Sequence, residues 1–180
     1  MLTWFRNRTV KDAKALQLYG SSVAQARQPA FYRRDCVADT LDGRFELVMM
    51  HVALLLRRLT AEGEAGKQLG RAVVEQMFAA LDDDMREIGI GDLNVPKKVH
   101  AAASAFYGRL NVYDEALKAG DLDALTGAAK RNFPAASGTE VASERIASYM
   151  MDTAGALAAQ PLEDLLRGHV RYLEREGTPV

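Results

Sequence analysis

The sequence predicts an all-α protein, a single-domain helical bundle of about six to eight helices. Apolar residues recur at spacings of three and four along most of the chain, and no segment alternates apolar with polar residues as a half-buried strand would. Glycine and proline divide this pattern into segments of helical length. The chain of 180 residues has the usual size of one domain, so we expect residues 1–180 to share one core.

The first predicted helix covers about residues 11–28. Its apolar side is formed by Leu16, Tyr19, Val23 and Ala26. Pro29 disfavours helical geometry in the residue before it and therefore ends the helix. We expect a short turn over residues 31–34.

The second predicted helix extends to Leu59, follows a charged, glycine-containing loop within residues 39–47 and is apolar on nearly every side. Thr40 or Asp42 is expected to cap its first turn, because either side chain carries an oxygen that can accept from a backbone N–H. A helix that is apolar all round is normally buried on most of its faces. This helix should therefore lie at the centre of the bundle.

The third predicted helix, about residues 67–88, begins after the glycines at positions 63 and 66 interrupt the chain. Its inner stripe consists of Val74, Phe78, Leu81, Met85 and Ile88. The segment Gly89–Asp92 contains two glycines and ends the helix in the manner of a glycine C-cap.

Four more helices are predicted toward the C-terminus. The longest runs from Pro96, which suits an early helical position, to Leu117, and Gly120 closes it. The others cover about residues 121–131, 140–159 and 162–174, with a loop over residues 133–138 and with Pro161 between the last two helices.

Composition and charge argue against several classes of protein. The 23 Lys and Arg residues are balanced by 24 Asp and Glu residues, and a net charge of −1 argues against nucleic acid as a main partner. Cys36 is the only cysteine, so no internal disulfide can form and a reducing compartment is expected. The longest apolar run, residues 47–56, is too short to span a bilayer. These features predict a soluble, cytoplasmic protein.

The N-terminal segment is basic, since residues 1–34 carry seven basic side chains and one acidic side chain. Trp4 and Phe5 precede several cations, a combination that suits contact with a membrane interface. These cations are Arg6, Arg8, Lys11 and Lys14. Packing of the two aromatic rings onto the body of the protein is an alternative of at least equal weight.

No catalytic or metal centre can be assigned from the sequence. Consecutive residues of a helix point in different directions, so the aspartates at 82–84 cannot converge on one ion, and Asp82 is instead placed to pair with Arg86. His51 lies within an apolar helix and has no identifiable partner, which favours an interior, hydrogen-bonded histidine. We expect no cofactor, no haem, no bound metal and no enzymatic activity.

Three blocks of sequence together resemble the ubiquinol-cytochrome c chaperone family, the assembly factors for cytochrome b of respiratory complex III. The first block comprises Phe31-Tyr32, Asp39–Leu47 and His51; the second comprises Met77-Phe78, residues 82–87 and Gly89–Asp92; the third comprises Val95–Lys98 and Ala105–Arg109. The resemblance covers about residues 18–117. The helices over residues 121–175 are expected to pack on that core.

The resemblance implies a non-enzymatic helical chaperone that holds newly made cytochrome b, a hydrophobic client protein. In mitochondria, family members act with a small helical co-chaperone. Because this chain lacks a long Arg-rich presequence, it is more similar to a bacterial-type member, which would be cytoplasmic and would contact the inner membrane peripherally. A helical bundle can offer an apolar groove to a client helix while charged loops set the orientation of that helix.

Nine residues of the matched blocks have chemistry that core packing least requires, and they form the predicted partner-binding site. They are Tyr32, Asp39, Asp42, Gly43, Arg44, Asp84, Arg86, Glu87 and Asp92. Several also have a purely structural explanation, because Asp42 can cap a helix, Gly43 can serve a turn and Arg44 can pair with a neighbouring acid.

Two other functions stay open at this point. The many apolar helix faces and the Trp4-Phe5 end also suit a helical lipid- or quinone-binding carrier protein. A metal-dependent helical hydrolase would rest only on the carboxylates between Asp82 and Asp92. The chaperone hypothesis is preferred because the three motif blocks support it and no catalytic set is visible.

Overall fold

The computed structural model describes residues 2–175, with side chains from residue 13 onward, and it confirms the all-α prediction. Eight helices are present in this range: α1 (Leu2–Ala26), α2 (Pro29–Arg33), α3 (Leu41–Thr60), α4 (Gly63–Glu87), α5 (Val95–Ala119), α6 (Leu122–Asn132), α7 (Ser143–Ala159) and α8 (Leu162–Leu166). Within the same range, the β interactions are limited to one isolated antiparallel bridge between Val37 and Ala135.

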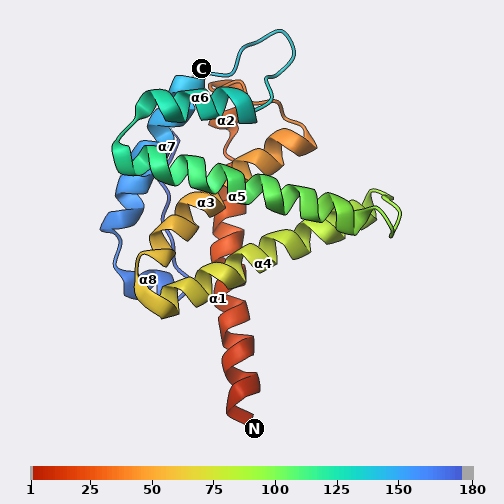
Figure 1. Cartoon of the computed structure of the whole chain (residues 1–180), viewed down its shortest axis with the longest axis vertical. Helices are drawn as coiled ribbons and strands as arrows, with labels where there is room; N and C mark the ends of the chain where they lie inside the picture. The colour runs from red at the N-terminus through yellow and green to blue at the C-terminus, as the bar shows by residue number, and fades with distance from the viewer. Residues whose placement is uncertain (1, 176–180) are drawn as a thin grey trace.

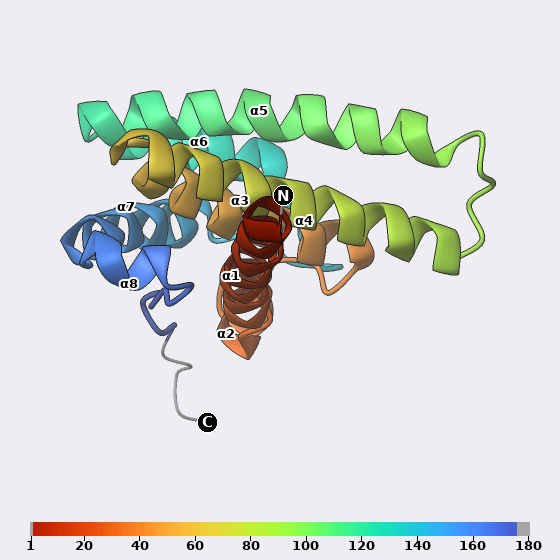
Figure 2. The same ribbon diagram turned by 90° about the horizontal axis from the view of Figure 1, so that it is seen from below.

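Helix α3 lies at the centre of the molecule, as its apolar sequence predicts. It contacts α1, α4, α5 and α7, and Figure 2 shows it between a layer containing α5 and α6 and a layer containing α1, α7 and α8. Leu47, Met50 and Leu55 are completely buried. Because burying a side chain of this size contributes about 1.5–3 kcal/mol, the packing around α3 holds the other helices together.

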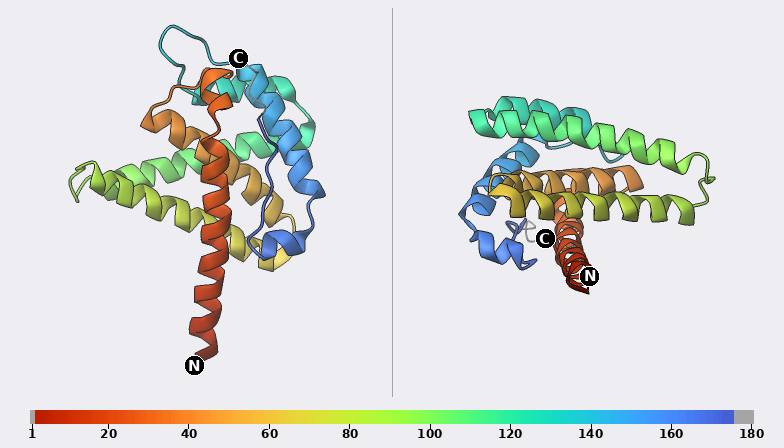
Figure 3. Two further views of the ribbon diagram at one scale, coloured as in Figure 1. Left: turned by 180° about the vertical axis from the view of Figure 1, so that it is seen from behind. Right: turned by 60° about the horizontal axis from the view of Figure 1, so that its bottom comes forward.

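Helices α4 and α5 form a long hairpin whose connecting segment projects from the body (Figure 1). The N-terminal turns of α1 extend beyond the other helices (Figures 1 and 3). The side chains of Trp4 and Phe5, on which the expected membrane contact depends, lie outside the side chains that the structure describes. Of the described helices, none combines the length and the apolar composition needed to cross a bilayer.

Several predicted helix boundaries are wrong, and glycine and proline explain two of them. Pro29 does end α1 but also begins the short helix α2, where a turn was expected, because proline suits the first helical position. Helix α4 begins at Gly63 and includes Gly66. A Cβ atom on Gly66 would lie 2.1 Å from the Leu59 carbonyl oxygen. Gly66 therefore allows a close approach to α3 instead of breaking the chain.

The largest difference between the predicted and the observed helices is in the last helix, because α8 ends at Leu166 and not near residue 174. Gly168 adopts a left-handed conformation with φ 95°. Residues 169–175, which we name the C-terminal strap, then run without helical structure between α1 and α7 (dark blue in Figure 3).

Three glutamine side chains hold the backbone of the C-terminal strap. Gln160 donates from Nε2 to the Arg171 carbonyl oxygen at 2.6 Å and accepts from the Arg171 N–H at 2.9 Å. Gln25 donates to the Leu173 carbonyl oxygen at 2.5 Å, and Gln28 accepts from the Arg175 N–H at 2.8 Å. Side-chain amides thus satisfy backbone groups that a continued helix would have paired internally.

His51 is completely buried in α3, and the prediction of an interior, hydrogen-bonded histidine is confirmed. Its Nδ1 lies 2.7 Å from the Leu47 carbonyl oxygen, and its Nε2 lies 2.9 Å from the Tyr149 hydroxyl. Because a carbonyl oxygen can only accept, Nδ1 carries the proton and Nε2 accepts from Tyr149. The rings of Phe31 and Tyr172 pack edge-on against the imidazole.

The buried position of His51 predicts a loss of stability in acid. Burial lowers the pKa of His51 from 6.5 to about 4, so its contribution to stability is present above pH 6.5 and is lost as the pH falls toward 4. This shift corresponds to a decrease of up to about 3 kcal/mol in the free energy of unfolding. Urea denaturation between pH 7 and pH 4 should show a weaker pH dependence for His51→Gln than for the exposed control His100→Gln. Equal pH dependence in the two variants would contradict the assignment.

A buried ion pair anchors the end of the C-terminal strap. Arg175 donates to both carboxylate oxygens of Asp35, at 3.0 Å and 2.9 Å, and Asp35 is completely buried. The Arg175→Ala variant should lower the free energy of unfolding by about 3 kcal/mol, because it leaves a buried carboxylate without its closest cation. Arg171→Ala is the matched control, since the exposed Arg171 contributes only backbone groups to the strap. Chemical denaturation that gave the same midpoint for both variants would disprove this role.

Candidate functional site: an apolar groove at the start of α3

An open groove of about 500 Å³ lies beside the N-terminal half of α3, and we name it the apolar groove. Its walls also include the C-terminal half of α4, which lies on the same side of α1 in Figure 1. The apolar lining consists of Val23, Ala26, Leu41, Phe45, Val48, Leu81, Met85, Ile88, Ile90 and Ala102. The polar lining consists of Tyr19, Arg27, Tyr32, Asp42, Arg44, Asp84 and Lys98. Residues from five helices therefore meet in one concave surface.

The apolar groove exposes aliphatic side chains that proteins usually bury. Leu41 is 58% exposed and Ile88 is 59% exposed. The prediction that Ile88 belongs to the inner stripe of its helix is therefore wrong. Like Leu41, this residue faces solvent in the isolated chain, and such clustered apolar exposure is typical of binding surfaces.

The predicted apolar side of α1 has three different environments. Leu16 is 58% exposed, whereas Ala15 and Leu18 are completely buried. Tyr19 and Val23 line the apolar groove. The stripe found in the sequence thus runs from solvent at Leu16 along the groove to the core at Ala26, and Ala15 and Leu18 add core contacts beside it.

A glycine motif shapes one edge of the apolar groove. Gly89 has φ 84°, its N–H donates to the Arg86 carbonyl oxygen, and the Ile90 N–H donates to the Met85 carbonyl oxygen, both at 3.0 Å. This pair of bonds is the Schellman arrangement, which commonly brings the two apolar residues at its ends together. Met85 and Ile90 both line the groove. The predicted glycine C-cap is confirmed.

The start of α3 is held by Thr40 and Gly43. The Thr40 hydroxyl accepts from the Gly43 N–H at 3.2 Å, so Thr40 is the N-cap, and the alternative that Asp42 caps the helix is wrong. Asp42 lies in the first turn and lines the apolar groove. A Cβ atom on Gly43 would lie 2.0 Å from the Ala38 carbonyl oxygen. Gly43 is therefore required for close packing of the preceding loop and offers no side chain to a partner.

Two polar groups at the groove are fixed by partners within the chain. Arg44 forms an ion pair with Asp39 at 2.6 Å, and this hydrogen bond lowers the pKa of the Asp39 carboxyl group. The Tyr32 hydroxyl donates to the Ala26 carbonyl oxygen at 2.9 Å. Burial, with a smaller effect of Asp39, raises the pKa of Tyr32. Tyr32 therefore presents a neutral ring to the groove at physiological pH.

Arg86 forms ion pairs at the segment that connects α4 to α5. Its guanidinium group pairs with Asp82 at 2.6 Å, which confirms the predicted pair, and with Asp92 at 2.5 Å. Neither Arg86 nor Asp92 lines the apolar groove, and Glu87 is exposed at the last position of α4. In the described part of the chain, no three His, Cys, Asp or Glu side chains come together as a metal site would require.

The structure thus separates the nine predicted site residues into three groups. Tyr32, Asp42, Arg44 and Asp84 line the apolar groove, Asp39 and Gly43 support its wall, and Arg86, Glu87 and Asp92 lie beyond its edge. Tyr19, Arg27 and Lys98 were missed. Lys98 belongs to a matched block of the sequence, but α1 residues could be placed here only by the fold.

Comparison with known proteins decides the family. Residues 36–172 match the model of the family described as Ubiquinol-cytochrome C chaperone. The chain belongs to this family. The family match includes α6 and α7, which lie after the blocks that carry the resemblance in the sequence.

Several relatives of this chaperone-family chain share one name. The chain is similar to the ubiquinol-cytochrome c reductase complex assembly factor 1 of Xenopus laevis, with 27% identity, and of Homo sapiens, with 29% identity, each over 107 residues. These alignments cover 59% of this chain, 54% of the frog protein and 36% of the human protein. The chain therefore spans about half or less of the length of these relatives.

A crystal structure extends the similarity to nearly the whole fold. The Cbp3 homolog from Brucella abortus matches with a TM-score of 0.84 and 33% sequence identity. The match covers 96% of this chain and 96% of that chain. The arrangement of helices around α3 is therefore shared with this family member.

Proposed function

We propose that this protein is a non-enzymatic chaperone for assembly of the ubiquinol-cytochrome c reductase complex, and that its client is newly made cytochrome b. The observation that carries the proposal is the apolar groove, with Leu41 and Ile88 exposed, in a chain of the ubiquinol-cytochrome C chaperone family. The similarity to relatives named assembly factor 1 of that complex supports it.

The chemistry of the apolar groove suits one face of a hydrophobic helix. Apolar surface that both partners remove from water contributes about 25 cal/mol per Å², and aliphatic side chains at helical spacing can enter a groove of this kind. Asp42 and Asp84 give the groove negative charge, whereas Arg27 and Lys98 give it positive charge. These charges would select the direction in which a client helix lies. Holding a client in this way requires no catalytic residue.

The proposal includes two further contacts. A small helical co-chaperone would bind outside the apolar groove, so that the groove stays open to the client. The basic N-terminal segment would bring the protein to the inner membrane from the cytoplasmic side, since residues 1–34 carry an excess of cations. Both contacts would place the groove near a client that is entering the membrane.

Substitutions in the apolar groove should reduce client capture without unfolding the protein. A photoreactive benzoylphenylalanine at position 45 should crosslink to cytochrome b. The Leu41→Glu and Ile88→Glu variants should each weaken this crosslink about tenfold, because each removes an apolar contact of about 1.5 kcal/mol and introduces a charge. Leu122→Glu on α6 is the matched control, since Leu122 is exposed but distant from the lining residues. Equal crosslinking in all three variants would show that the groove is not the binding surface.

Deletion of the gene should lower the amount of assembled complex III while the cytochrome b transcript is unchanged. Blue-native electrophoresis and transcript quantification measure the two quantities. The wild-type protein and Leu122→Glu should restore assembly, whereas the double variant Leu41→Glu/Ile88→Glu should not. Normal assembly in the deletion strain would falsify the chaperone proposal. A stoichiometric lipid or quinone in organic extracts of the purified protein would instead favour the carrier function.

A further inference from the structure

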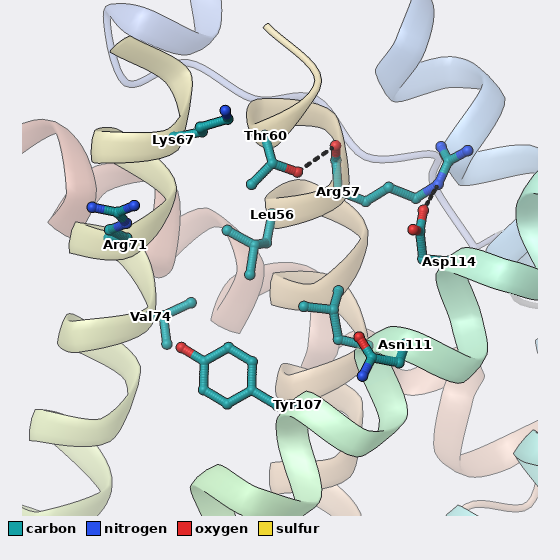
Figure 4. A pocket seen from close by; sticks show the side chains of 10 residues that line it. Leu56, Arg57, Thr60, Lys67, Arg71, Val74, Tyr107, Asn111 and Asp114 are labelled. Carbon is teal, nitrogen blue, oxygen red and sulfur yellow. Dashed lines mark hydrogen bonds and ion pairs between the residues drawn. The ribbon is translucent and has the colours of Figure 1, made fainter. Parts of the chain in front are cut away.

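A second cavity lies at the opposite end of α3 from the apolar groove. It has a volume of about 370 Å³ and opens between α3, α4 and α5. Figure 4 shows Lys67 and Arg71 on the α4 side, Arg57 and Thr60 on α3, and Tyr107 on α5. The volume falls within the range of about 300–1,000 Å³ that is typical of small-molecule sites. We name it the cationic cavity.

Two cations on one wall of the cationic cavity have no counter-ion among the side chains that the structure describes. Lys67 and Arg71 are exposed and stand one turn apart on α4. The ion pairs formed among the described residues include neither of them, although they include Arg57 and Arg58 of α3. Like charges at this spacing repel one another. An anion that bound both would remove this repulsion.

The single carboxylate of the cavity is already shared between two other cations. Asp114 accepts from Arg57 Nε at 3.0 Å and from Lys118 at 2.6 Å. Arg57 and Asp114 lie on the opposite side of the cavity from Lys67 and Arg71 (Figure 4). The lining therefore has an excess of positive charge, and a concave surface with one sign of charge concentrates ions of the opposite sign.

The remaining lining combines neutral polar groups with an apolar floor. Tyr107 is half exposed, and its hydroxyl points across the cavity toward α4 (Figure 4). Asn111 adds an amide group from the next turn of α5. Leu56 and Val74 are buried beneath these groups. The cavity thus offers charged and neutral donors above a surface suited to carbon atoms.

We propose that the cationic cavity binds a phosphate group that is attached to a carbon-based molecule. Lys67 and Arg71 would contact the phosphate oxygens, because a guanidinium group binds phosphate in a bidentate manner and an ammonium group binds it as a point charge. Leu56 and Val74 would contact the carbon portion. A phospholipid headgroup and a small soluble phosphate ester share this chemistry. The inference stands on the cavity alone and does not depend on the proposed function.

The test uses the full chain labelled with ¹⁵N and two soluble probes, inorganic phosphate and dihexanoyl phosphatidic acid. Backbone amide signals of residues 56–60, 67–74 and 107–114 should shift, and dihexanoyl phosphatidic acid should bind more tightly than inorganic phosphate. The Lys67→Ala/Arg71→Ala variant should weaken binding about tenfold or more, because it removes two charge-assisted contacts. The control Lys97→Ala/Lys130→Ala removes the same charge at exposed positions outside the cavity and should bind as the wild type does.

Vesicles distinguish the two sources of phosphate. If the phosphate belongs to a phospholipid, co-sedimentation with vesicles of equal parts phosphatidylglycerol and phosphatidylcholine should be weaker in Lys67→Ala/Arg71→Ala than in the control, because both variants keep the same basic N-terminal segment. Binding of the soluble probes without this difference would assign a small phosphate ester. The conservative variant Lys67→Arg/Arg71→Lys should retain binding in either case. Absence of shifts in the three segments, or equal weakening in both alanine variants, would overturn the proposal.

Discussion

Burial of α3 on every side is the constraint on which the rest of the structure depends. A helix with Leu47, Met50 and Leu55 around its circumference is stable in water only when other helices cover it. Helices α1, α4, α5 and α7 provide this cover. His51 is the one imidazole within this buried helix. Both of its ring nitrogens are hydrogen bonded and the ring is neutral, so His51 places no charge in the core.

The cover is continuous around the middle of α3 and opens at the two ends of the helix. The apolar groove begins at Leu41, in the first turn, and the cationic cavity reaches Thr60, in the last turn. The first surface is mainly apolar, whereas the second has an excess of positive charge. One buried helix therefore separates two proposed binding surfaces of different chemistry.

Much of the fold could be predicted because the relevant signals are local. Gly89 and Gly120 end helices through their own left-handed backbone conformations, and Asp121 caps α6 through a bond to a residue three positions later. Apolar periodicity shows that one face of a helix is apolar, but it does not show what covers that face. Ile88 was therefore predicted to lie on an inner stripe, although the fold leaves it exposed.

The same limit applies to the candidate site and to the C-terminus. Tyr32, Asp42 and Arg44 could be identified because they lie in one short segment, whereas Tyr19 reaches the groove only through the packing of α1. The spacing of apolar residues after Pro161 is helical, yet hydrogen bonds from distant glutamines, such as Gln25, stabilise an extended strap there. Here hydrogen bonds between residues far apart in the sequence outweigh a local preference for helix. The local spacing of apolar residues cannot show this effect.

The way in which the C-terminal strap is held determines how freely its sequence can change over evolution. Gln25, Gln28 and Gln160 recognise main-chain atoms, which every amino acid except proline provides in full. The side chains of Leu173 and Glu174 are exposed and take no part in this attachment. Val170, Tyr172 and Arg175 are held through their side chains. Homologous chains could therefore diversify the outer surface of this segment, and acquire new contacts there, while keeping the same architecture.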